Sequence, residues 1–264
     1  MKDYSYLLPQ LSALAVQVAH FINEQRVQAH QIEQKSINSL VSFVDKGAEE
    51  IIIKGLKSML PAASILAEES APDHPWDSLM WVIDPLDGTT NYLHGLPFYA
   101  ISIALVADGK SVIGIVHDVV HNDSYTAALG KGSYCNGVKL SVSNNPKLSD
   151  SFAATGFPYY DFDKMEAYLE CFRYFMKNTR GIRRIGSAAL DLAYVAAGKF
   201  DFFWEYKLQT WDIAAGTLLV QEAGGIVSEI DGGDQFLKSG HCIASSPQLH
   251  PEILEIIKTA FETN

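Results

Sequence analysis

The chain contains 264 residues, of which 48% are hydrophobic and 19% are charged. This length and composition exclude a disordered chain and allow either one large domain or two closely packed halves. The formal net charge of −11 argues against a broad nucleic-acid-binding face and against an anionic membrane surface as partners. It still permits a phosphorylated substrate, because bound divalent cations reverse the local charge.

Signals for targeting and for disulfides are absent from this sequence. Cys135, Cys171 and Cys242 are far apart and form no Cys-x-x-Cys pair, so we expect reduced thiols and neither a zinc site nor a disulfide framework. The N-terminus lacks a basic segment followed by an apolar one, and no apolar run approaches the roughly 20 residues that span a bilayer. We therefore expect a soluble cytoplasmic protein.

The first half is predicted to begin with helices and to continue with strands. Its apolar spacing predicts an amphipathic helix at 7–22, and the polar stretch at 31–38 is expected to form a hairpin arm or mobile loop. Residues 41–44 are expected to end a short strand, and a second helix follows, whose inner apolar stripe spans 51–60. Asp45 is interpreted as the N-cap of the second helix, which Pro61 ends. Apolar or alternating segments predict strands, the last three in an antiparallel meander, at 64–67, 79–83, 99–106, 111–118 and 125–129.

The second half, from Ser151 onward, alternates between the two kinds of element. Strands are predicted at 152–155, 182–185, 200–205 and 226–230, and helices at 164–176, 188–197, 213–223 and 251–261. No flexible linker separates residues 1–150 from residues 151–264, so we expect one unit over 1–264 in which an N-terminal α+β half packs on a C-terminal α/β half. The fold class predicted is a layered α+β or mixed α/β sandwich.

The strand predicted at 79–83 ends in a pair of carboxylates. Asp84 and Asp87 are three residues apart, and Pro85 fixes φ and keeps Asp84 out of the helical region. Both carboxylates and the Leu86 carbonyl can therefore face one point. Oxygen ligands of this kind suit Mg²⁺ or Mn²⁺.

The residues that follow this pair favour a phosphate ligand. Gly88 lets the backbone approach a ligand closely, and Thr89-Thr90-Asn91 resembles the start of a helix, whose free N–H groups attract phosphate. The alternative for the whole Asp-Pro-x-Asp-Gly segment is a tight surface turn. An apolar strand before it and a helix start after it favour a ligand site over a simple hairpin.

Other acidic residues lie at comparable junctions between strands and helices or loops. Glu68 and Glu69 follow the strand 64–67, with a solvated pair as the alternative, and Asp212 precedes a helix, with an N-cap as the alternative. Crevices at such junctions bind ligands in open sheets. Acidic side chains gathered on an apolar frame repel one another, so a hard cation is the expected neutralising partner.

These motifs resemble the inositol monophosphatase family of Mg²⁺-dependent, lithium-sensitive phosphomonoesterases. The resemblance covers nearly the whole chain and is carried by Asp84-Pro-Leu-Asp-Gly-Thr-Thr-Asn91, Trp211-Asp-Ile-Ala-Ala-Gly216, Glu222-Ala-Gly-Gly225, Glu68-Glu69-Ser70, Gly186-Ser-Ala-Ala-Leu190 and Val41 to Asp45. It implies an αβαβα layered sandwich, a homodimer, and direct attack on the phosphate by a water molecule that metal activates.

The resemblance also implies roles for individual residues. Two or three Mg²⁺ ions would be held by Glu68, Asp84, the Leu86 carbonyl, Asp87 and Asp212. The catalytic set would be Thr89, Asp45 and Glu68, with Thr89 orienting the attacking water. The phosphate and the polyol would be bound by Gly88, Thr89, Gly186, Ser187, Ala188, Glu205 and Asp212.

The substrate is predicted from the branch of the family that the motifs resemble. Gly88 to Tyr92 and the position of Glu205, seven residues before Asp212, resemble the inositol branch, although Gln209 stands where animal enzymes have a histidine. We therefore expect hydrolysis of inositol 1-phosphate and related sugar or polyol monophosphates. The alternatives are a fructose-1,6-bisphosphatase, a histidinol-phosphatase, a 3′-phosphoadenosine nucleotidase, or a non-catalytic binding relative.

Several charged residues have no assigned role at this level. Lys35 lies in the predicted arm, His94 follows the central motif, and Arg183 and Arg184 lie in a predicted strand, where a second phosphate, a partner subunit or a charge pair on a sheet edge are all open. A loop or surface position is the preferred interpretation of His94. His117, Asp118 and His121 are expected to serve strand pairing or a dimer contact rather than a metal.

Overall fold

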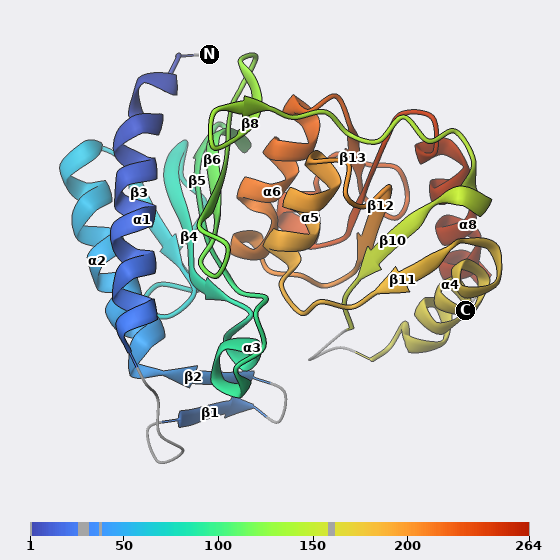
Figure 1. Ribbon diagram of the computed structural model, residues 1–264, viewed down its shortest axis with the longest axis horizontal. Helices are drawn as coiled ribbons and strands as arrows, with labels where there is room; N and C mark the ends of the chain where they lie inside the picture. The colour runs from blue at the N-terminus through green and yellow to red at the C-terminus, as the bar shows by residue number, and fades with distance from the viewer. Residues whose placement is uncertain (1, 26–31, 37–38, 158–161, 264) are drawn as a thin grey trace.

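The computed structural model describes residues 2–25, 32–36, 39–157 and 162–263, and it describes no side chains between 26 and 41. Helices and sheets alternate in five layers across the molecule (Figure 1). A helix pair covers the first sheet, a second helix pair lies between the two sheets, and a third pair covers the second sheet. This is the αβαβα sandwich that the sequence predicts.

The first layer consists of α1 (Leu8–Glu24), preceded by the 3₁₀ turn η1 (Ser5–Leu7), and of α2 (Phe43–Met59). By length and composition alone the segment Ser5–Glu24 is long and apolar enough to cross a membrane, contrary to the expectation from the sequence. Its apolar face, including Leu11, Val18 and Ile22, is fully buried against α2 and the first sheet. That position is typical of a core helix.

The first sheet has a strand order that follows the chain. Its described strands, in spatial order, are β3 (Ser64–Ala67), β4 (Leu79–Asp87), β5 (Ala100–Ala107), β6 (Lys110–Asp118), β7 (Asp123–Ala128), β8 (Gly132–Cys135) and β9 (Val138–Lys139). β3 is parallel to β4 and the other pairs are antiparallel. Every residue of β5 is buried, because helices cover both faces of the sheet. A short helix, α3 (Thr89–His94), follows β4.

The middle layer brings two helix starts to the end of β4. α5 (Ala188–Ala196) and α6 (Thr210–Glu222) lie between the sheets, and eight consecutive residues of α6, Ile213–Val220, are buried. A helix that is buried all round needs apolar or small residues on every side, and the Ala-Ala-Gly run of α6 meets that need. These two helices carry Ser187 and Asp212 toward the carboxylates of β4.

The second sheet and its outer helices complete the fold. Its described strands, in spatial order, are β11 (Gly181–Arg183), β10 (Phe152–Thr155), β12 (Phe202–Glu205), β14 (Cys242–Ser245) and β13 (Ile226–Ser228). β10 is parallel to both of its neighbours, whereas β14 is antiparallel to both of its own. The remaining elements are η3 (Leu148–Asp150), α7 (Phe236–Ser239) and the outer helices α4 (Met165–Asn178) and α8 (His250–Thr263).

Several predicted elements need correction. The short strand predicted to end at 41–44 is present as β2 (Ser39–Ser42), but it ends two residues earlier than expected, where α2 begins. Ser42 rather than Asp45 is the N-cap of α2. β2 pairs with β1 (Ile32–Ser36), so part of the predicted arm is a hairpin, while residue 31, residues 37–38 and the side chain of Lys35 lie outside the described residues. The short elements β8, β14 and α7 were not predicted, and several strands are shorter than expected.

Candidate active site

A cleft of about 880 Å³ opens where β4 ends and the middle helices begin. Both halves of the chain line it: Glu68, Asp84 and Asp87 from the first half, and Glu205 and Asp212 from the second. A cleft of this size accommodates a small organic ligand.

Three carboxylates converge at the bottom of this cleft. One oxygen from each of Asp84, Asp87 and Asp212 lies within 4.8 Å of the other two. Asp84 is only 2% exposed, and the other two residues are half-buried. Such a set of hard oxygen donors is the kind that holds Mg²⁺. Residues separated by more than 120 positions in the sequence thus meet at one point, as the sequence predicted.

Burial raises the pKa values of these carboxyl groups, and repulsion between neighbouring carboxylates adds to the effect. Burial raises the pKa of Asp84 well above its ordinary value, and the charges of Glu68, Asp87 and Asp212 raise it further. Burial also raises the pKa of Asp87 to about 6. The pKa of Asp212 rises for the same reasons, burial first and then Asp87 and Glu68. A divalent cation among them would favour the ionised forms and relieve this repulsion.

Glu68 stands beside this group rather than within its tightest part. Its N–H donates to the Ile83 carbonyl (3.2 Å), which ties the end of β3 to β4 next to Asp84. The following N–H, of Glu69, donates to the buried carboxylate of Glu49 (2.8 Å). Both glutamates line the cleft, so the alternative of a pair that is merely solvated does not describe them.

A hydrogen-bonded chain runs from the start of α2 to Thr89 in the wall of the cleft. The Asp45 Oδ2 accepts from the Ser42 N–H (2.8 Å) and the Ser42 hydroxyl (2.7 Å), and the Asp45 Oδ1 accepts from the Thr89 hydroxyl (2.8 Å). The same Thr89 oxygen lies 2.9 Å from the Leu86 carbonyl oxygen. Asp45 is thus the third helical residue of a capping box, and its second oxygen accepts from Thr89.

The start of α5 fixes Asp87. The Ser187 hydroxyl (2.6 Å) and the Ala189 N–H (2.7 Å) both donate to the Asp87 Oδ2. These donors lower the pKa of Asp87 against the larger effect of burial. Gly186, Ser187 and Ala188, which the family resemblance assigns to the substrate pocket, all line the cleft.

Gly88 is required at the turn between β4 and α3. Its φ of +91° lies in the left-handed region, and a Cβ atom there would lie 2.7 Å from the Phe98 carbonyl oxygen. Asn91, in the first turn of α3, donates from Nδ2 to the carbonyls of Phe98 and Ile185, both at 2.7 Å. The turn therefore binds the segment that precedes α5, and the surface-turn alternative for Asp84 to Gly88 is wrong.

Glu205 is a buried carboxyl group that also lines the cleft. It is 6% exposed, and burial raises its pKa to about 8 although the nearby Arg184 lowers it. A Cβ on Gly156 would lie 2.0 Å from the Glu205 Oε2, so the carboxyl group occupies the space of a side chain at position 156. Arg184 also lines the cleft, with its Cζ 5.3 Å from the centroid of the Phe157 ring.

From the sequence, Asp212 could be a metal ligand or the N-cap of a helix. Gln209 is the N-cap of α6, and Asp212 is the third helical residue, whose Oδ2 accepts from the Gln209 N–H (2.7 Å). The N-cap alternative for Asp212 is therefore wrong. The carboxylate stabilises the helix start and reaches the acidic cluster at the same time.

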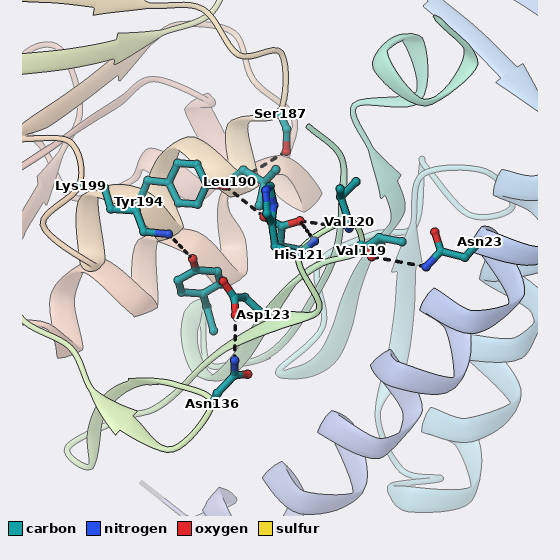
Figure 2. A network of polar contacts seen from close by, with 12 residues as sticks. Asn23, Val119, Val120, His121, Asp123, Asn136, Ser187, Leu190, Tyr194 and Lys199 are labelled. Carbon is teal, nitrogen blue, oxygen red and sulfur yellow. Dashed lines mark hydrogen bonds and ion pairs between the residues drawn. The ribbon is translucent and has the colours of Figure 1, made fainter. Parts of the chain in front are cut away.

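Polar contacts anchor the far end of α5 to the turn between β6 and β7 (Figure 2). The Tyr194 hydroxyl donates to the Asp118 Oδ2 (3.0 Å), which also lies 2.9 Å from the His121 Nδ1. Within the described residues, the group of His, Cys, Asp or Glu side chains that could hold a metal is the acidic cluster of the cleft. Asp118 and His121 serve the packing of α5 instead.

Some residues of the cleft were not identified from the sequence. Asp191, Gly156 and Phe157 line the cleft although no motif pointed to them. His94 lines it too, and its side chain is exposed, which agrees with the surface position expected from the sequence. An acidic residue within the apolar run of α5 was the available signal for Asp191.

Comparisons with known proteins agree with this geometry. A family model described as "Inositol monophosphatase family" matches residues 3–262. The "Nus factor SuhB" of Pseudomonas aeruginosa is 41% identical over 243 residues, 90% of each chain. The "Inositol-1-monophosphatase" of Mesorhizobium japonicum is 42% identical over 233 residues, 88% of each chain. The crystal structure of extragenic suppressor protein suhB from Bartonella henselae has a TM-score of 0.88 at 37% identity, covering 96% of this chain and 98% of that chain.

Proposed function

The chain belongs to the inositol monophosphatase family, and on that basis we propose that it is a Mg²⁺-dependent phosphomonoesterase that hydrolyses inositol 1-phosphate and related sugar or polyol monophosphates. One observation carries the proposal: Asp84, Asp87 and Asp212 bring carboxylate oxygens within 4.8 Å of one another inside a cleft. Glu68 and the Leu86 carbonyl are proposed to complete the ligand set for two or three ions.

The residues around this cluster have separable tasks in the proposed reaction. Bound Mg²⁺ would supply charge neutralisation of the phosphate and a water of lowered pKa. The Thr89 hydroxyl donates to Asp45, so a lone pair of its oxygen is left to accept a hydrogen bond from the attacking water. The N–H groups of Gly88 and Thr89 are proposed to hold phosphate oxygens. Asp45 holds the Thr89 hydroxyl and takes no direct part in bonding to phosphate.

The polyol is proposed to lie toward the second half of the chain. Gly186, Ser187, Ala188 and Glu205 line that end of the cleft, and the carboxyl groups of Glu205 and Asp212 are suited to accept hydrogen bonds from hydroxyl groups. Lithium inhibition would follow from occupation of one of the cation positions.

The test is a phosphate-release panel with and without Mg²⁺. The panel contains inositol 1-phosphate, fructose 1,6-bisphosphate, histidinol phosphate and adenosine 3′,5′-bisphosphate. We expect Mg²⁺-dependent release, with inositol 1-phosphate among the best substrates. A tenfold or greater preference for one of the other three would replace the substrate assignment, and no release from any of them would reject the enzyme assignment.

A second role, as a binding protein, is favoured by the name of one relative. The Pseudomonas aeruginosa protein is called a Nus factor, and it is as similar to this chain as the relative named a phosphatase. Asp87→Asn separates the two roles, because it removes a proposed metal ligand while the amide oxygen can still accept from Ser187 and Ala189. We expect this variant to fold normally and to lose most phosphatase activity. Full retention of any partner binding by the variant would show that binding does not need catalysis.

We further propose that the protein is a cytoplasmic homodimer. The outer face of α4 exposes a row of large apolar side chains, Met165, Leu169 and Met176, which are 41%, 38% and 59% exposed. Exposed apolar rows of this kind are common at subunit interfaces. Sedimentation velocity at micromolar concentration tests the dimer, and a single species of 29 kDa would reject it.

A further inference from the structure

Two buried carboxyl groups lie one turn apart on α2, and the proposed reaction uses only one of them. Asp45 and Glu49 are 1% and 2% exposed, and both belong to the buried face of the helix. Residues four positions apart lie on the same helix face, so the two side chains project from α2 side by side. Asp45 holds Thr89, whereas the proposed reaction gives Glu49 no task. A carboxyl group this far from water needs a polar partner.

The partner of Glu49 is the backbone of the turn that follows β3. Its Oε2 accepts a hydrogen bond from the Glu69 N–H, and the oxygen and nitrogen are 2.8 Å apart. α2 itself does not need this carboxyl group. Other residues form the capping box at the helix start, and Glu49 lies in the buried stripe between Ala48 and Ile52, where an apolar side chain would suit the helix. The carboxyl group of Glu49 therefore acts outside the helix, on the turn.

The turn held in this way carries Glu68, one of the proposed metal ligands. The N–H groups of Ala67 and Ala71 each donate to the other residue's carbonyl, at 3.3 and 3.2 Å, which closes the turn. The Glu68 N–H donates to the Ile83 carbonyl (3.2 Å), which ties the turn to β4. The bond to Glu49 ties the next N–H of the turn to α2. The backbone N–H groups before and after the Glu68 side chain are thus both fixed, and Glu68 lines the cleft.

α2 therefore holds two parts of the cleft at a fixed spacing. Asp45 accepts from the Thr89 hydroxyl, and one helical turn further along Glu49 accepts from the turn that carries Glu68. Four residues of an α-helix span about 6 Å, and this distance changes little because backbone hydrogen bonds close every turn. Thr89, which is proposed to orient the attacking water, and Glu68, which is proposed to bind Mg²⁺, are thus attached to one rigid element.

We propose that Glu49 is a positioning residue that holds the turn at 68–70, and with it the Glu68 carboxylate, in the position needed to bind Mg²⁺. Of the described residues that line the cleft, Glu49 is not one, so it acts through the turn as a hydrogen-bond acceptor rather than on the cation itself. The inference rests on the proposed function, because it assumes a cation at the acidic cluster. The alternative that the experiment separates is a general contribution of the negative charge of Glu49 to the field of the cleft.

The test measures cation binding in the absence of turnover. Metal-free protein is titrated with Mn²⁺, whose free ion is counted by electron paramagnetic resonance, and competition with Mg²⁺ gives the affinity for that ion. Glu49→Leu removes the acceptor, and we expect the Kd of the tightest site to rise about tenfold, as is common when a partner that orients a metal ligand is lost. Glu49→Gln keeps an oxygen acceptor and should stay within about threefold of the wild type. Glu50→Gln, at the exposed neighbouring position, is the control and should leave the Kd unchanged.

A second pair of measurements separates positioning from a general loss of structure. The Mg²⁺ concentration that gives half-maximal phosphate release should rise about tenfold in Glu49→Leu. The melting temperature of the same variant without metal should fall by no more than about 3 °C, because an apolar residue replaces a buried carboxyl group. If Glu49→Leu does not fold, Glu49→Met, which keeps the unbranched shape, takes its place with the same expected results.

Three results would overturn this inference alone. They are an unchanged Kd in the apolar variant, an equal loss of affinity in Glu49→Gln, and a much lower melting temperature of the metal-free apolar variant. The second result would assign the effect to the charge of Glu49, and the third would assign it to folding. Wild-type protein that binds neither Mn²⁺ nor Mg²⁺ would instead reject the proposed function, and this inference with it.

Discussion

At the scale of single residues, the cleft works by leaving selected atoms without internal partners. The Asp45 carboxylate is saturated on one oxygen by Ser42 and holds Thr89 with the other. Because the Thr89 hydroxyl donates its proton to Asp45, its oxygen keeps the capacity to accept a hydrogen bond, as the proposed reaction requires. At Asp87, two donors from the start of α5 occupy one oxygen, and one oxygen of the same carboxylate belongs to the acidic cluster.

The hydroxyl of Thr89 is predicted to be needed for turnover rather than for folding. Thr89→Val keeps the shape and removes the hydroxyl, so we expect kcat to fall about 10²- to 10⁴-fold with a small change in KM. Thr89→Ser keeps the hydroxyl and should remain within about tenfold of the wild type. Steady-state phosphate release with inositol 1-phosphate measures both, and equal activity of the two variants would remove Thr89 from the mechanism.

At the scale of elements, the starts of helices supply the site. α2, α5 and α6 each begin next to the cleft. Asp45 and Asp212 lie in the first turns of α2 and α6, and Ser187 is the N-cap of α5. Capping boxes at α2 and α6 use acidic residues three positions after the cap. The same hydrogen bonds therefore stabilise the helix and aim the carboxylate.

Substitution of Ser42 tests whether the capping box of α2 both stabilises the helix and orients the Asp45 carboxylate. Its hydroxyl oxygen accepts from the Val44 N–H (3.1 Å) and its hydroxyl donates to Asp45. We expect Ser42→Ala to lower the free energy of unfolding by about 1 kcal/mol and also to reduce kcat, because Asp45 loses a donor. Urea unfolding and phosphate release provide the two measurements.

Ser58, which is exposed near the end of the same helix, supplies the matched control. Ser58→Ala should leave activity unchanged and stability unchanged or slightly higher, since alanine favours helices. If Ser42→Ala matched Ser58→Ala in both measurements, the capping box would have no role in the site.

The sequence predicted the long elements and the acidic site better than it predicted short elements and caps. Periodicity identifies α1 and β6 because many residues repeat the pattern, whereas β14 has only four residues and owes its place to pairing with β12 and β13. The local pattern predicts Asp45 as the cap of α2, but Ser42 is also a residue type that favours N-caps, and the structure places the cap there. Asp191 was missed because its surroundings come from β12 and the segment after β11, which no local pattern reveals.

At the scale of the whole molecule, the two halves of the chain contribute like charges to one site. Asp84 and Asp87 come from the first sheet and Asp212 comes from the middle layer, so the site exists only when both halves pack together. Burial and mutual repulsion make this packing unfavourable for ionised carboxylates. A cation that binds them must therefore stabilise the packed molecule.

This coupling predicts that stabilisation by Mg²⁺ depends on pH. The pKa of Asp87 in the folded, metal-free protein is about 6, above its ordinary value of 3.8, so the folded state binds the proton more tightly than the unfolded state does. The stabilisation from that proton is complete below about pH 3.8 and is lost as the pH rises through about 6. Above that range the carboxylate is ionised and open to a cation, whereas below it protons compete.

We expect 10 mM Mg²⁺ to raise the melting temperature more at pH 7.5 than at pH 5. If this concentration is tenfold above Kd, one site adds about 1.4 kcal/mol, or about 3–6 °C for a chain of this length. Differential scanning fluorimetry at both pH values, with NaCl matched for ionic strength, measures the shift. Asp87→Asn should show a smaller shift at pH 7.5 and little dependence on pH. An equal shift in the wild type at both pH values, or none at either, would mean that the carboxylates of the two halves do not hold the cation together.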